Sequence, residues 1–114
     1  MTVREIADKL ELEILTDGAG LDREVTGGYA SDLLSDVIGH GEAGNIWVTL
    51  QTHGNIVAVA TLKELAAVVL VGGRMPEAET LDRARQEKVL LLRSSLPSFE
   101  VAGRLYQLGV RGKG

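Results

Sequence analysis

The sequence predicts an α/β fold: a single domain with a largely parallel central sheet and helices on both faces. A short apolar run, a turn of small or polar residues and a helix-like stretch follow one another three times. The apolar runs are 46–50, 67–71 and 89–92. None of them alternates with polar residues, which is typical of parallel strands that are buried on both faces. Right-handed crossover connections would place the helices against the sheet.

The N-terminal segment predicts a helix and then two short strands. Thr2 and Glu5 have the spacing of a capping box, and the apolar residues of 3–10 repeat as on one face of a helix. Residues 11–15 alternate in hydropathy, as a short strand does. After a glycine-rich turn, 21–25 predict a second strand, antiparallel to the first.

Residues 27–38 lead into the first buried run. The pair Gly27-Gly28 admits two interpretations, a close approach of another backbone or a bulge. Ser31 is placed to cap a helix that contains the apolar residues of 33–38, and Asp32 would lie at the positive end of that helix.

The later helices are predicted from the residues at their starts. Asn55 is placed to cap the helix after the first buried run. Thr61 and Glu64 have the spacing of a second capping box, so we expect that helix to break or restart there. Pro76 suits the first position of the next helix, and the last helix begins near Pro97.

Composition excludes several classes of function. The chain has 114 residues, a net charge of −4 and no cysteine, which excludes disulfides and thiolate metal sites. The histidines lie in no ligand-spaced motif, so we expect no metal and no cofactor. Cations are dispersed and aromatic residues are few, so we expect no nucleic-acid partner. No apolar run approaches about 20 residues, so we expect no membrane span, and without a signal peptide at the start we expect a cytoplasmic protein.

Four segments carry a family resemblance: 28–37 (GYASDLLSDV), 47–49 (WVT), 51–60 (QTHGNIVAVA) and 71–76 (VGGRMP). On these segments the chain, taken as one domain over 1–114, resembles the DRTGG domain family. The resemblance implies a non-catalytic α/β module that occurs beside CBS domains and tends to dimerise. It also implies a fold related to the N-terminal domain of bacterial HPr kinase/phosphorylase. Free-standing versions resemble proteins encoded beside iron-only hydrogenase genes, which makes such an enzyme a candidate partner.

No catalytic residue is predicted. A P-loop needs Gly, four residues and then Gly-Lys-Ser/Thr to hold the phosphates and magnesium. Here Gly112-Lys113 is followed by Gly114, and Gln107 stands where the first glycine belongs. No nucleophile–base pair is visible either, so we expect no enzyme and, in particular, no kinase.

The turns that follow strands carry the predicted binding site. In parallel sheets, ligands bind at the carboxyl ends of the strands, where helix N-termini favour anions. We therefore expect a small anionic ligand, such as an adenine nucleotide, to contact a rim of turn residues. The rim consists of Ser31, Gln51, His53, Asn55, Gly72, Gly73 and Ser94.

The rim residues also have plainer interpretations. Gly72-Gly73 can form an anion-binding turn or only a tight turn with positive φ, and Pro76 removes one amide donor nearby. His53 and Asn55 can contact a ligand or a second subunit, or be a surface histidine and a helix cap.

Residues 56–67 are apolar nearly all round, which is typical of a fully buried helix. In so short a chain, this predicts a homodimer, and a deep core within one chain is the alternative.

The sequence leaves three candidate functions. The first is a dimeric regulatory or ligand-binding module, the second a structural accessory protein that docks on a partner enzyme, and the third an enzyme of unknown type.

Overall fold

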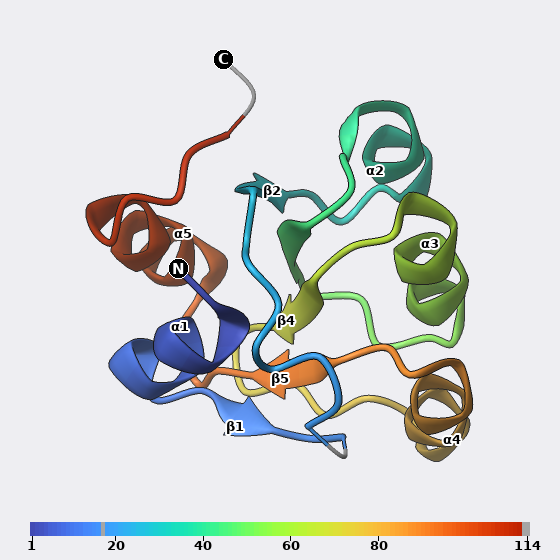
Figure 1. Ribbon diagram of the computed structural model, residues 1–114. Helices are drawn as coiled ribbons and strands as arrows, with labels where there is room; N and C mark the ends of the chain where they lie inside the picture. The colour runs from blue at the N-terminus through green and yellow to red at the C-terminus, as the bar shows by residue number, and fades with distance from the viewer. Residues whose placement is uncertain (17, 113–114) are drawn as a thin grey trace.

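The computed structural model describes residues 1–16 and 18–112 (Figure 1). Helices and strands alternate along most of this length. In chain order, the elements are α1 (Val3–Leu10), β1 (Glu13–Ile14), β2 (Gly27–Ala30), α2 (Leu34–His40), β3 (Asn45–Thr49), α3 (Asn55–Lys63), β4 (Ala67–Leu70), α4 (Ala78–Glu87), β5 (Leu91–Arg93) and α5 (Ser98–Gln107).

The strands of the described residues form one sheet in the order β1-β5-β4-β3-β2. The pairs β2–β3, β3–β4 and β4–β5 are parallel, and β1 joins β5 in antiparallel orientation. The predicted runs 46–50, 67–71 and 89–92 overlap β3, β4 and β5, whose central residues are buried. The predicted α/β class with a largely parallel sheet is therefore confirmed.

The order of the strands decides which helices share a face. From β2 to β5, each strand lies beside the next one in the sequence, so the right-handed crossovers all pass over the same face. Helices α2, α3 and α4 therefore cover one face, and α1 and α5 cover the other (Figure 1). Helices on both faces were predicted. Because the strand order does not reverse between β2 and β5, this part of the sheet lacks the crevice that a reversal opens.

Alternate residues of each buried strand supply two cores. Trp47 and Val68 pack toward α2, α3 and α4, whereas Ile46 and Val69 pack toward α1 and α5. The apolar surface of α3 has a place in this arrangement, since α3 contacts α2 on one side and α4 on the other. A deep core within one chain, the alternative interpretation of 56–67, thus accounts for most of that segment without a second subunit.

The prediction of a strand over 21–25 is wrong. The carbonyls of Leu21 and Arg23 accept hydrogen bonds from Arg4 N and Val3 N, at 2.8 Å and 3.0 Å. The segment thus satisfies amides of the first turn of α1, which have no partner within the helix. Strand β1 pairs with β5 instead.

Several helix starts differ from the prediction. Helix α3 runs unbroken through Thr61, and Glu64 is its left-handed C-cap with φ 54°, so the predicted break is wrong. Its N-cap is Gly54, and Asn55 is its first residue. Helix α4 begins two residues after Pro76, because Glu77 is still extended (φ −61°, ψ 151°), and its amide donates to the carbonyl of Thr52 at 3.2 Å.

Helix α2 begins at Leu34, and its N-cap is Leu33 rather than Ser31. The glycines before it form strand β2, where another backbone approaches closely. Gly28 N donates to the carbonyl of Arg111 at 3.1 Å, and a Cβ on Gly27 would lie 2.8 Å from that oxygen. Of the two interpretations of Gly27-Gly28, the structure shows the close approach.

Candidate functional site

The turns after β2, β3, β4 and β5 lie along one edge of the sheet, which we call the carboxyl-end edge (residues 31–33, 50–54, 71–76 and 94–97). The predicted rim residues lie in these turns, except Asn55, which follows the second turn as the first residue of α3. Hydrogen bonds do not gather them around one common centre. Gln51 bonds Asp32, the neighbour of Ser31, whereas Asn55 bonds His53 and Gly73 bonds Ser94.

Asp32 holds the turns after β2 and β3 together. Its Oδ1 accepts hydrogen bonds from Thr49 Oγ1 at 2.9 Å and from the amide of Leu50 at 2.7 Å. The side-chain amide of Gln51 donates to the carbonyl of Asp32 at 2.9 Å. The predicted rim residue Gln51 therefore already serves to fix a turn.

The turns after β4 and β5 are joined through backbone amides. Gly72 N donates to Leu96 O at 2.8 Å and Gly73 N to Ser94 O at 2.9 Å. Both glycines have positive φ, 66° and 72°, as the tight-turn interpretation requires. Since both amides donate within the fold, an anion at this turn would have to be bound by side chains.

His53 and Asn55 form the most open group. Asn55 N donates to His53 Nδ1 at 3.1 Å, and both residues are exposed. A neutral His53 that accepts through Nδ1 carries its proton on Nε2, which is left to donate outward. The side chain of Asn55 forms no hydrogen bond with the residues that the structure describes.

Arginines at this edge were missed by the sequence analysis. Arg74 follows the glycine pair and is exposed, and the Nη1 atom of Arg83 lies 3.0 Å from the point where a Cβ on Gly54 would stand. Neither forms an ion pair within residues 1–16 and 18–112. Arg93 is already engaged, by Glu13 at 2.6 Å and by the carbonyl of Gly73. Arg74 could have been noticed beside Gly72-Gly73, whereas Arg83 comes from α4 and only the tertiary structure places it.

A second polar cluster lies where β2 meets α2. Tyr29 Oη donates to Asp36 Oδ2 at 2.8 Å, and His40 Nδ1 lies 3.0 Å from Asp36 Oδ1. The hydrogen bond from Tyr29 lowers the pKa of Asp36, the Ser31 hydroxyl adds to this, and the same bond to Asp36 raises the pKa of Tyr29. Ser31 thus belongs to this cluster as much as to the rim.

The described residues contain neither a metal-binding cluster nor a membrane-spanning helix. No group of three or more His, Asp or Glu side chains gathers at metal-binding distances within the described part of the chain. In the same residues, no helix has the length and apolar character that crossing a membrane would require.

Comparison with known proteins gives a likeness of fold. No family model and no curated protein matches the chain. Among solved structures, the chain is similar to the CBS and DRTGG domains of the regulatory region of Clostridium perfringens pyrophosphatase, complexed with the activator diadenosine tetraphosphate. The TM-score is 0.73 at 14% identity, over 90% of this chain and 44% of that chain.

The fold of this chain is DRTGG-like. The chain spans less than half the length of that structure, and at this identity the likeness concerns the fold alone.

Within the DRTGG-like fold, the segments that carried the family resemblance have definite structural roles. The indole nitrogen of Trp47 donates to the carbonyl of Ser31 at 2.8 Å, and the hydroxyl of Thr49 donates to Asp32 Oδ1 at 2.9 Å. The WVT segment therefore anchors the GYASD segment onto β3. The two segments therefore have a structural role in joining β2 to β3.

Proposed function

We propose that the chain is a non-catalytic, dimeric regulatory module that binds a small anion, such as an adenine nucleotide, at the carboxyl-end edge. The observation that carries the proposal is the likeness of fold to a regulatory region complexed with a nucleotide activator. Because adenine nucleotides are abundant in the cytoplasm, we propose that location.

The geometry of the edge supports an anion held by side chains. Arg74 and Arg83 flank the turns after β4 and β3 and have no carboxylate partner among the described residues. His53 can donate through Nε2 beside the N-terminus of α3, whose dipole favours negative charge. Phosphate oxygens accept strong, charge-assisted hydrogen bonds from such donors.

A second function, docking on a partner enzyme such as an iron-only hydrogenase, is favoured by a different observation. Leu33, Ile38 and Leu62 are exposed on or beside α2 and α3, two helices in contact. Exposed aliphatic side chains on neighbouring helices suit a protein partner better than a nucleotide.

A titration with ATP, monitored by amide NMR, tests whether the chain binds a nucleotide. We expect shifts first in the turns of the carboxyl-end edge. The double variant Arg74→Gln/Arg83→Gln should bind ATP at least about tenfold more weakly, since each lost hydrogen bond to a charged group is worth roughly 1.5–3 kcal/mol. Arg104→Gln, on α5, is the matched control and should bind as the wild type does.

Two results would count against the proposal. Shifts confined to the opposite edge, or none at millimolar ATP, would remove nucleotide binding. Co-purification with a hydrogenase subunit that is lost on Leu62→Glu would then favour the docking function.

A further inference from the structure

Helix α5 exposes aromatic surface that the fold leaves uncovered. Phe99 is 86% exposed and Tyr106 is 59% exposed. They lie seven residues apart, about two helical turns, and so point the same way. Ala102 and Gly103 stand between them on this face, so that a stripe of aromatic and small residues runs along the helix.

Beside this stripe lies an apolar hollow of about 150 Å³, which we call the α5–β2 hollow. Small residues create it, since Gly28 and Ala30 of β2 and Ala102 of α5 leave space above Val48. The C-terminal segment closes one side, passing beside β2 after α5 (Figure 1). An engineered apolar cavity of roughly this volume holds benzene, so the hollow has room for one phenyl ring.

We propose that α5 forms a two-fold contact with a second copy of this chain, in which Phe99 of each copy enters the α5–β2 hollow of the other. This proposal rests on the dimer that the proposed function includes, and it names the surface. Phe99 and the α5–β2 hollow are both present on one chain, and both lie along α5. Such self-complementarity is what an isologous contact requires.

The spacing along α5 fits an antiparallel crossing. Phe99 and Tyr106 lie equally far on either side of the midpoint between Ala102 and Gly103. A two-fold axis at this midpoint sets each Phe99 opposite Tyr106 of the partner subunit, at the level of the hollow. Gly103 is at the crossing, where a Cβ would meet nothing within 4 Å, and a small residue there lets two helices approach closely.

Charge is complementary in the same arrangement. The guanidinium of Arg111 lies 3.7 Å above the ring of Tyr106 and has no carboxylate partner in the part of the chain that the structure describes. Glu100 is exposed on α5 and likewise unpaired there. The antiparallel crossing brings Glu100 close to the level of the partner's Tyr106, and so to the guanidinium stacked on it.

Disulfide crosslinking locates the contact, because the chain has no cysteine of its own. Gly103→Cys places one thiol per copy beside the proposed axis, within reach of a disulfide. Under mild oxidation at micromolar protein, we expect Gly103→Cys to form a covalent dimer. Leu62→Cys, equally exposed on α3, should stay a monomer on denaturing gels. Crosslinking of Leu62→Cys without Gly103→Cys would overturn the proposal.

Light scattering of charge variants tests whether the ring of Phe99 forms the dimer contact. We expect the wild type at twice 12.2 kDa and Phe99→Glu at 12.2 kDa, still folded by circular dichroism because Phe99 is exposed on the single chain. Gly103→Glu should likewise dissociate the dimer and stay folded, since replacing glycine favours the helix. Leu62→Glu is the matched control and should remain a dimer.

The outcomes separate the two proposals. A wild type at 12.2 kDa at all concentrations would overturn both the dimer and this interface. A Phe99→Glu protein that stays dimeric would overturn this interface alone and leave the proposed dimer standing. Protection of the hollow by ATP in the wild type, with the dimer unchanged by Phe99→Glu, would show that a ligand, not a second copy, occupies it.

Discussion

Ser31 and Ser94 show what a small polar residue does at the end of a strand in this fold. The Ser31 hydroxyl accepts from Leu33 N at 3.2 Å, and the Ser94 hydroxyl accepts from Leu96 N at 3.1 Å. Both are the same local turn, in which a side chain bonds the amide two residues on. The Ser31 hydroxyl also interacts with Asp36, and Ser94 is buried, which is why the candidate site depends on His53 and on arginines.

The Tyr29–Asp36 contact gives a pH-dependent prediction. Its hydrogen bond lowers the pKa of Asp36, so its stabilisation is present above about pH 4 and is lost as pH falls through the lowered pKa. Tyr29→Phe should therefore lower the Tm at pH 7, and the difference from wild type should shrink in acid.

Thermal unfolding between pH 3 and pH 7 checks this, with Tyr106→Phe as the control. The phenol of Tyr106 has no hydrogen-bond acceptor within the described residues, so its loss should leave the pH profile unchanged. A Tm difference for Tyr29→Phe that is constant with pH would show that packing, rather than the hydrogen bond, is responsible.

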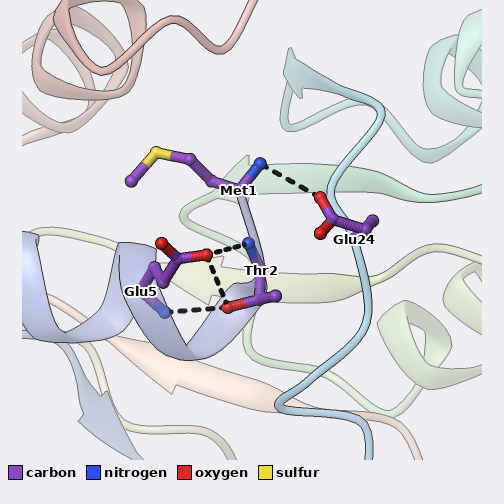
Figure 2. Close-up of polar contacts among 4 residues, drawn as sticks. All are labelled: Met1, Thr2, Glu5 and Glu24. Atoms are coloured by element: carbon purple, nitrogen blue, oxygen red, sulfur yellow. Dashed lines mark hydrogen bonds and ion pairs between the residues drawn. The ribbon is translucent and has the colours of Figure 1, made fainter.

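At the scale of elements, two segments with the same capping pattern behave differently. Thr2 accepts from Glu5 N at 3.2 Å while the carboxylate of Glu5 accepts from Thr2 N at 3.0 Å, which completes a capping box (Figure 2). Thr61 has Glu64 at the same spacing but lies inside α3. The difference lies in the backbone: an apolar helical run continues into Thr61, whereas Thr2 is extended (φ −81°, ψ 162°) and the Met1 amine beside it is held by Glu24 at 3.1 Å.

The same substitution at both positions distinguishes them. Thr2→Ala should lower the free energy of unfolding by about 1 kcal/mol, because an amide of the first turn loses its acceptor. Thr61→Ala should change it by less than about 0.5 kcal/mol, and in the stabilising direction, since alanine is the better helix former. Urea unfolding of both variants measures this, and equal losses would contradict the cap at Thr2.

For the whole molecule, the position of α3 between α2 and α4 explains where apolar surface is covered. Val59 is 5% exposed within a single chain, whereas Leu62, three residues on, is 65% exposed. The helix is thus apolar all round because neighbouring helices and the sheet cover most of it. The apolar character of α3 therefore does not require a second subunit.

Aspartate at these two positions tests that explanation. Val59→Asp should lose about 3–5 kcal/mol of stability, since it buries an unpaired charge, and should be unfolded or insoluble. Leu62→Asp should lose about 1 kcal/mol or less, from helix propensity and the helix dipole. Circular dichroism and solubility decide the matter, and a folded Val59→Asp protein would show that α3 faces a second subunit.

Sequence patterns determined the strands β3, β4 and β5, whereas the choice between the two interpretations of Gly27-Gly28 needed the structure. An unbroken apolar run reports that both faces of a strand are buried, and this is a local property. The edge on which the candidate site lies followed from the same pattern, because parallel strands end together. The polar groups at that edge could be named from the sequence, but not which of them bond one another.

The tertiary structure alone decided the order of the strands, the partner of β1 and the loop that covers the start of α1. It also placed Arg83 against Gly54 and left Phe99 exposed beside a hollow. The physical reason is common to all of these. Periodicity tells how many faces of an element are buried, whereas the identity of what covers each face depends on contacts between residues distant in the chain.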